Sequence, residues 1–237
     1  MKNVLIIACR ELRSFFNSPV AYIVLTVYLL LAGYLYFTQL FLGREAEMRG
    51  LFELTPLLFV FFVPAVTMRL IAEERRAGTL EVLLTLPLTD WQVVLGKFLG
   101  ALGLLAVGIG LTLAYPFTVS KLGDLDGGAV LGGYLGLLFL GATYAAIGVM
   151  ASSFAKNQVV AFIIALGICF ALFLAGKLVG VMPRAIAPIV DYLSLDSHFQ
   201  SIARGVIDTR DLVYYASISG ACLFVAQQSL ASRQWKG

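Results

Sequence analysis

Six long stretches of this chain contain few or no charged residues, and each is long enough to cross a lipid bilayer as a helix. They are Pro19–Gly43, Leu51–Ile71, Phe98–Ser120, Gly127–Ala155, Asn157–Gly176 and Leu212–Ser232. A bilayer core of ~30 Å requires ~20 helical residues, because each residue advances the helix by ~1.5 Å. With 60% hydrophobic and 13% charged residues, a soluble globule could not bury so much apolar surface. The sequence therefore predicts an all-α integral membrane protein with six transmembrane helices in a single domain, residues 1–237.

The segment before the first span, residues 2–18, is amphipathic. Its apolar residues fall near one helical face, namely Val4, Leu5, Ala8, Leu12, Phe15 and Phe16. Its polar residues fall elsewhere, namely Lys2, Arg10, Arg13 and Asn17. This pattern predicts an interfacial helix that lies in the plane of the membrane. The Ser18-Pro19 pair is expected to end that helix.

The distribution of lysine and arginine indicates which side of the membrane each loop occupies. An even number of spans places both termini on one side. If that side is the cytoplasm, it receives ten positive residues, Lys97 among them, and the outer side receives seven. The bias has the sign of the positive-inside rule, so we expect both termini to be cytoplasmic. Trp91 and Trp235 then both lie at the inner interface.

The inner segment Glu73–Lys97 is the first of two polar regions. It begins with four consecutive charged residues, Glu73, Glu74, Arg75 and Arg76. After Gly78, a short run from Thr79 to Leu86 is stopped by Pro87. A helix over this run places three leucines on one face, away from Glu81: Leu80, Leu83 and Leu84. A solvated connection would explain the polarity, but a segment with its own start, stop and apolar face favours a docking element for a cytosolic partner.

Local signals predict how the third and fourth spans begin and pack. Thr89 and Gln92 fit a capping box that opens the third span. Gly96-x-x-x-Gly100 and Gly132-x-x-x-Gly136 are pairs of small residues that let helix backbones approach closely. We expect them to serve packing within the chain, with a dimer seam as the alternative.

The second polar region, residues 182–211, is expected on the outer side. Long loops in compact proteins usually have structure of their own. Two short helices fit this region, the second capped by Asp196 or Ser197 and ended by Gly205. The candidate functional residues here are Asp196, His198, Phe199, Arg204 and Asp208. A structural role is the simplest interpretation of His198, the only histidine, because a metal site would need further ligands such as Asp191 and Asp196.

Motifs that the sequence lacks exclude several functional classes. It has no GxxxxGKS/T phosphate loop, so the chain is not expected to bind ATP in the manner of a P-loop protein. It has no HExxH motif, no Cys or His cluster and no Ser–His or paired-Asp site in a span, which argues against an intramembrane enzyme. The spans contain essentially no ionisable residue, unlike those of ion-coupled carriers. The small net charge of +3 gives no reason to expect a nucleic acid partner.

The inner segment resembles the corresponding loop of ABC-2 type permeases. The similar residues are Glu73-Glu74-Arg75-Arg76-x-Gly78-Thr79-Leu80-Glu81, Leu83-Leu84, Pro87-Leu88 and Gly96-Lys97. Three further stretches are similar to the gliding-motility-associated permease subfamily: Glu11–Ile23, Ala65–Arg69 and Asp196–Leu212. The permease of the nitrous-oxide reductase copper-maturation transporter is a more distant relative. The resemblance covers nearly the whole chain.

The resemblance implies a type V exporter fold, with the interfacial helix, six spans and an outer re-entrant hairpin before the last span. It implies a multi-pass protein of the bacterial inner membrane that pairs with a second permease, identical or related. Two cytosolic ATPase subunits would bind ATP and Mg²⁺, so this chain would hold no cofactor and would not itself be an enzyme. The helix at Thr79–Leu86 would be the coupling helix, and Glu73–Arg76 would form the charged stretch beside the gate. A further membrane protein with a large outer domain often joins such complexes.

Two functions from different classes follow from these observations. The first is a permease subunit, expected to export, that an ATPase drives. The second is a membrane anchor or mechanotransmitter, which the ATPase drives but which acts on an outer partner and moves no cargo. Spans without buried charge favour an apolar or amphipathic cargo.

Overall fold

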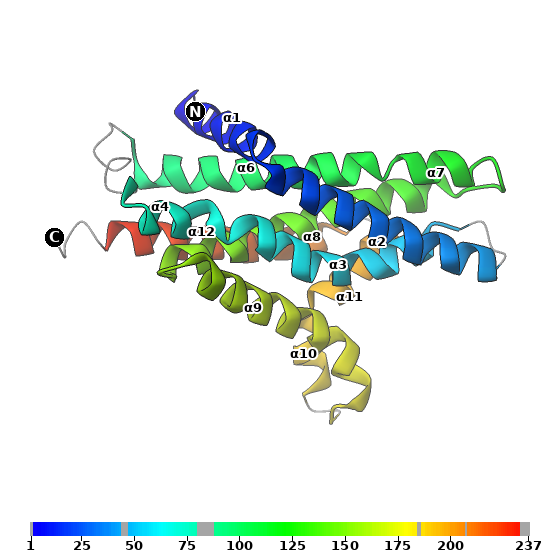
Figure 1. The fold of residues 1–237 in the computed structure, drawn as a ribbon. Helices are drawn as coiled ribbons and strands as arrows, with labels where there is room; N and C mark the ends of the chain where they lie inside the picture. The colour runs from blue at the N-terminus through cyan, green and yellow to red at the C-terminus, as the bar shows by residue number, and fades with distance from the viewer. Residues whose placement is uncertain (1, 44–46, 80–87, 184–185, 207, 233–237) are drawn as a thin grey trace.

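The computed structural model describes residues 2–43, 47–79, 88–183, 186–206 and 208–232, and all elements within these ranges are helices (Figure 1). The two N-terminal helices are α1 (Lys2–Asn17) and α2 (Pro19–Gly43). The break between them falls at Ser18, whose hydroxyl donates to the carbonyl of Phe15 at 3.2 Å. Proline suits the first position of a helix, where no intrahelical N–H is needed. The predicted end of the first helix at Ser18-Pro19 is therefore confirmed.

The middle of the chain forms the body of the bundle. Its helices are α3 (Arg49–Thr67), α4 (Arg69–Arg76), α6 (Asp90–Leu111), α7 (Ala114–Val119), α8 (Gly127–Phe154) and α9 (Gln158–Leu178). Helix α8 lies at the centre and packs against α3, α6, α9 and α12. The chain turns from α8 into α9 within three residues, so the two helices form a tight hairpin around Lys156. The long helices run side by side, and the start of α1 and the end of the chain's last helix lie toward the same end of the bundle (Figure 1).

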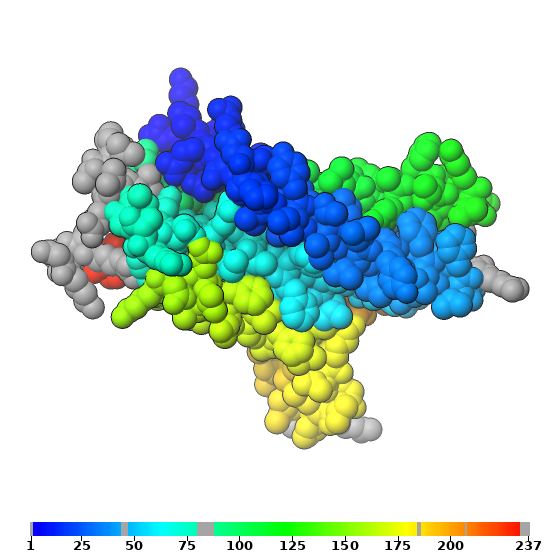
Figure 2. Space-filling model, viewed as in Figure 1, coloured from blue at the N-terminus to red at the C-terminus, as the bar shows by residue number. Residues whose placement is uncertain are grey.

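The last part of the chain contains the short elements η1 (Val179–Val181), α10 (Ala187–Leu193) and α11 (Leu195–Ala203), followed by α12 (Thr209–Ala231). The two short helices predicted in the outer segment are present. The N-cap of the second is Ser194, whose hydroxyl accepts from the N–H of Ser197 at 3.2 Å, so the predicted cap at Asp196 or Ser197 is wrong. The helix ends before Gly205, which adopts φ of 85°. Helix α9 diverges from the bundle and carries α10 outward as an arm (Figures 1 and 2).

Five helical runs are long and apolar enough to cross a membrane: Pro19–Gly43, Arg49–Arg76, Asp90–Val119, Gly127–Phe154 and Gln158–Val181. They correspond to the first five predicted spans. Helix α12, the predicted sixth span, is long enough to cross a membrane, but it is not apolar enough to be counted with these five runs. It contains Gln227, Gln228 and Ser229, and Ser229 is buried and donates to the carbonyl of Ser153. The sixth span therefore stays a prediction.

The glycine pairs serve packing within the chain. A Cβ atom added to Gly96 would lie 2.6 Å from Ile7 Cβ, and one added to Gly100 would lie 2.6 Å from Glu11 Cβ. Helix α1 therefore lies directly on the backbone of α6. Gly136 of α8 faces Phe199 of α11 in the same way. The preferred interpretation of both pairs is confirmed.

A charged cluster and an outer pocket as candidate functional sites

The two flanks of segment 80–87 meet at a buried lysine. Lys97, two turns into α6, has no exposed surface. Its Nζ lies 2.7 Å from Glu74 Oε1 of α4 and 3.2 Å from Glu11 Oε1 of α1. Arg10 Nη2 completes the group, 2.8 Å from Glu11 Oε1 and 3.5 Å from Glu74 Oε1. We call these four residues the charged cluster.

The charged cluster is electrically balanced, with two cations and two carboxylates. An ammonium group removed from water is strongly destabilising unless it is paired and hydrogen-bonded. Lys97 therefore holds α1 and α4 against α6, because moving either helix away would leave its charge less compensated. Burial by itself would raise the pKa of Glu11, but Lys97 and Arg10 outweigh burial and hold it below the ordinary value of 4.5.

The structure places Lys97 inside a helix. The sequence predicted that the inner segment runs to Lys97, that the uncharged run of the third span begins at Phe98, and that a capping box at Thr89 opens that span. Helix α6 begins at Asp90 as the capping box predicted, because Thr89 accepts from the N–H of Gln92 while Gln92 accepts from the N–H of Thr89. Lys97 is consequently a buried residue of a helix with a membrane-spanning composition.

Helix α4 is also fixed to the end of α8. Ser152 Oγ accepts from the N–H groups of Ile71 and Ala72 at 3.1 and 3.0 Å, and donates to the carbonyl of Met68 at 2.9 Å. The guanidinium of Arg75 donates to the carbonyls of Ser153 and Ala155. The last carbonyls of a helix have no partner within that helix. Arg75 thus joins the end of α4 to a position where α8 needs donors.

The predicted coupling residues divide into three groups. Glu74 and Arg75 are held by the contacts above. The side chains of Glu73, Arg76 and Thr79 are exposed and take no part in the charged cluster. The remaining predicted residues lie outside the described ranges: Leu80, Glu81, Leu83, Leu84 and Pro87. The sequence did not single out Glu11 or Arg10 as site residues, because no local pattern connects Glu11 to a lysine 86 residues away.

In the outer segment, His198 is bound at both ring nitrogens. Nδ1 lies 2.6 Å from Asp211 Oδ1, and Nε2 lies 3.1 Å from the carbonyl of Tyr192. The imidazole stacks on Tyr214 with 3.9 Å between ring centroids. His198 and Asp211 are both buried. The ring therefore joins α10, α11 and α12, and Asp211 was not among the residues predicted.

The other predicted outer residues have separate positions. Asp196 is paired with Lys177 at 2.8 Å and accepts from Gln200 at 2.9 Å, so it does not face His198. Asp191 accepts from Ser197 instead. Phe199 is buried against α8, and Asp208 caps α12 by accepting from the N–H of Arg210. Within the described residues, no three His, Cys, Asp or Glu side chains are grouped to hold a metal ion.

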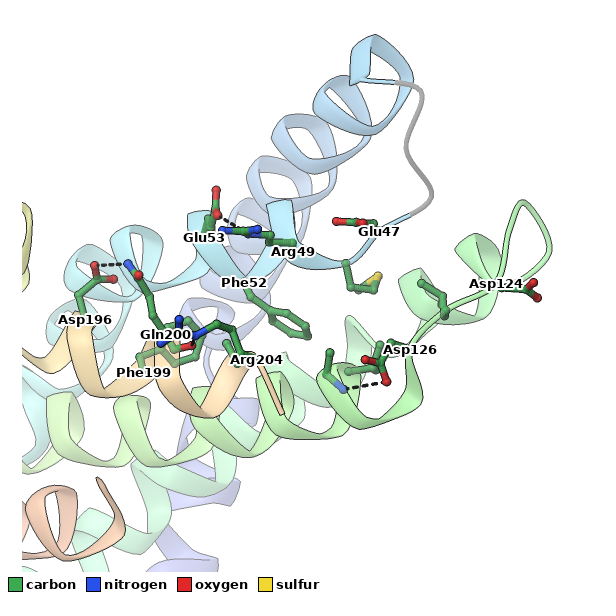
Figure 3. Close-up of a pocket in the computed structure, with 15 residues that line it drawn as sticks. Glu47, Arg49, Phe52, Glu53, Asp124, Asp126, Asp196, Phe199, Gln200 and Arg204 are labelled. Carbon is green, nitrogen blue, oxygen red and sulfur yellow. Dashed lines mark hydrogen bonds and ion pairs between the residues drawn. The ribbon is translucent and has the colours of Figure 1, made fainter. Parts of the chain in front are cut away.

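A pocket of about 400 Å³ opens between α3, α11 and the stretch before α8 (Figure 3). The stretch before α8 lies at the opposite end of the bundle from α4, which carries Glu74 of the charged cluster (Figure 1). Its charged residues are Glu47, Arg49, Glu53, Asp124, Asp126, Asp196 and Arg204. Arg49 is paired with Glu53, and Asp126 caps α8, so part of this charge is already compensated. Phe52 and Phe199 form an apolar wall (Figure 3). An apolar wall with a charged rim suits an amphipathic molecule.

Comparison with known proteins identifies one family. The family profile described as "ABC-2 family transporter protein" matches residues 5–227, which is nearly the whole chain. A comparison with proteins of curated function found no match. The matched range includes the charged cluster and the outer segment.

Proposed function

Because the chain belongs to the ABC-2 family of transporter proteins, we propose that it is the membrane permease subunit of an ATP-driven transporter whose ATPase is a separate cytosolic protein. Segment 80–87 docks on that ATPase. The charged cluster carries this proposal, since it ties both flanks of the segment to α1 and to each other. If α4 and α6 could move independently, a movement of the ATPase would shift the docking segment alone. Because the charged cluster holds the two helices together, the movement is transferred to both of them.

The mechanism is thermodynamic linkage. ATP binding moves the permease only if the closed ATPase contacts the docking segment differently from the open one. Helices α4 and α6 then move together, because Lys97 joins them, and α4 takes the end of α8 with it through Ser152. Since α8 packs against most of the bundle, its displacement reaches the opposite end.

The finer features of the proposal follow the family resemblance. Helix α12 is the sixth span, with Ser229 buried against α8. The end with the charged cluster faces the cytoplasm, and two permeases pair in a bacterial inner membrane. Helices α10 and α11 form the re-entrant hairpin, and the direction of transport is export. The pocket at the opposite end favours an amphipathic cargo on its way out.

The test is assembly with an ATPase followed by paired substitutions. The wild-type chain, extracted in mild detergent, should retain an ATP-hydrolysing subunit whose activity in nanodiscs depends on the permease. Replacing Leu83 and Leu84 with Asp should remove the subunit or abolish the stimulation while the permease still inserts. Leu122→Asp is the matched control, because Leu122 is an exposed leucine outside the docking segment. Normal assembly and stimulation in the Leu83/Leu84 variant would show the docking assignment to be wrong.

One observation favours the mechanotransmitter as the second candidate. The arm at α10 exposes apolar side chains, with Ile189 63% and Leu193 50% exposed. An outer partner could bind them and receive the movement without any cargo crossing. ATPase stimulation without accumulation of any candidate cargo in inverted vesicles would favour this function over transport.

A further inference from the structure

Helix α1 can face its surroundings in only one orientation. Glu11 is its single acidic residue, and the carboxylate points inward to Lys97. Ile7, Ala8 and Phe15 are buried on the same side, and Gly96 leaves no room for α1 to roll. Because the charge of Lys97 requires Glu11, the rotation of α1 about its axis is fixed.

The fixed rotation leaves a cationic and apolar stripe facing outward. We call Lys2, Leu5, Ile6, Cys9 and Arg13 the outward stripe; all five are exposed. Leu5 and Ile6 are 60% and 66% exposed. Within the described part of the chain, neither Lys2 nor Arg13 forms an ion pair. The two cations lie ~16 Å apart along the helix, at a rise of ~1.5 Å per residue.

We infer that the outward stripe is a docking surface for the anionic headgroups of the inner leaflet. Its chemistry fits that occupant, because phosphate groups bind Lys and Arg while Leu5 and Ile6 enter the acyl region between them. No carboxylate of α1 opposes the attraction, since Glu11 is turned inward. Anionic lipid would therefore hold α1 in the position in which Glu11 reaches Lys97.

The position of α1 favours lipid over a cytosolic protein. Helix α1 lies along the side of α6, with Ile7 packed on Val93 and Glu11 beside Gly100, and it projects sideways from the bundle (Figures 1 and 2). It leads directly into α2, whose composition is that of a membrane span. A helix that leaves the side of the bundle where a span begins meets the membrane surface. This inference rests on the proposed function only in placing α1 on the inner side.

Cys9 provides the probe, since it is exposed and belongs to the outward stripe. The full chain, with Cys169 and Cys222 replaced by Ala, is labelled at Cys9 with an environment-sensitive fluorophore. Phosphatidylglycerol or phosphatidylcholine is then titrated into the detergent micelles. Phosphatidylglycerol should shift the emission to the blue at a lower mole fraction than phosphatidylcholine. Each cation contributes ~1 kcal/mol near an anionic surface, so Lys2→Gln with Arg13→Gln should weaken binding to phosphatidylglycerol roughly 30-fold and remove its advantage over phosphatidylcholine.

The matched control removes two positive charges elsewhere. Lys121→Gln with Lys156→Gln changes two exposed lysines outside α1 and should leave the titration unchanged. Equal responses to the two lipids, or an unchanged response in the Lys2/Arg13 variant, would overturn the inference. So would a shift produced by the ATPase and not by lipid, since the stripe would then be a protein contact. Retention of the ATPase is measured separately, so failure of the lipid test leaves the proposed function intact.

Discussion

Lys97 Nζ and Glu74 Oε1 lie 2.7 Å apart and join the two helices from which segment 80–87 emerges. Lys97 is fully buried, whereas about a fifth of the Glu74 side chain is exposed, at 21%. The pair joins the two helices that flank segment 80–87 at a buried position, where water screens the attraction between the charges poorly. The pair therefore links α4 directly to α6.

We expect Lys97→Met and Glu74→Gln to be strongly coupled. Each single variant leaves the charged cluster unbalanced, whereas the double variant removes both members of the pair. Because hydrogen bonds to charged groups contribute ~1.5–3 kcal/mol, the coupling energy should fall in that range. The measurement is a double-mutant cycle on the free energy of unfolding in mild detergent.

The exposed pair of Arg49 and Glu53, one turn apart on α3 at 3.0 Å, provides the control cycle. Pairs of this kind in helices contribute ~0.3–0.5 kcal/mol. If the Lys97–Glu74 cycle gave no more coupling than this control, the charged cluster would not be what holds α4 to α6.

Acidification should release α1. The pKa of Glu11 is below its ordinary value of 4.5 in the folded protein. The ionised carboxylate therefore stabilises the fold fully above pH 4.5. This contribution is lost as the pH falls through the lowered pKa that Glu11 has in the folded protein. The unfolding temperatures of the wild type and of Glu11→Gln should differ by a constant amount above pH 4.5. They should converge as the pH falls below 4.5. Glu53→Gln, at an exposed site, should show a small difference at every pH; a similar profile for both variants would contradict the prediction.

The sequence predicted the helices well because the signals for them are local. The uncharged run Pro19–Gly43 became α2 without change. Thr89 and Gln92 form the expected capping box, and Gly205 ends α11 as predicted. Each of these features depends on residues within one or two turns of one another, and such short patterns determine the backbone directly.

The charged cluster could not be predicted, because its members come from three helices that no local pattern connects. Glu11 and Lys97 each look like an ordinary charge at the end of an apolar run. Only the close approach of α1 to Gly96 and Gly100 brings them together. The pairing of His198 with Asp211 escaped prediction for the same reason, since it depends on how α11 and α12 fold back on each other.

Gly100→Leu should detach α1 from α6. A Cβ at this position would lie 2.6 Å from Glu11 Cβ and 3.3 Å from the carbonyl of Ala8, so a larger side chain requires the helix to move. Overpacking of this kind costs ~1–3 kcal/mol. Loss of the Glu11–Lys97 contact should also speed hydrogen exchange in residues 2–17. Gly110→Leu is the control on the same helix, because nothing lies within 4 Å of its added Cβ. Equal effects of the two substitutions would rule out the close contact.

His198→Ala should loosen the outer arm without unfolding the bundle. The substitution removes the hydrogen bonds to Asp211 and to the carbonyl of Tyr192, together with the stack on Tyr214. It leaves Asp211 buried without a partner, and an unsatisfied buried group costs ~1–3 kcal/mol or more when charged. Hydrogen exchange should accelerate in residues 187–203 and stay unchanged in α2 and α8.

Asp208→Asn is the matched control for the outer arm, because Asp208 is exposed and asparagine is an equally good N-cap. Asp211→Ala should reproduce the effect of His198→Ala, since it breaks the same contact from the other side. Two hydrogen bonds would survive both changes, from Tyr214 Oη to the carbonyl of Leu193 and from Tyr215 Oη to that of Leu195. Unchanged exchange in α10 would mean that these two tyrosines suffice to hold the arm, and that the pairing of His198 with Asp211 does not fix its position.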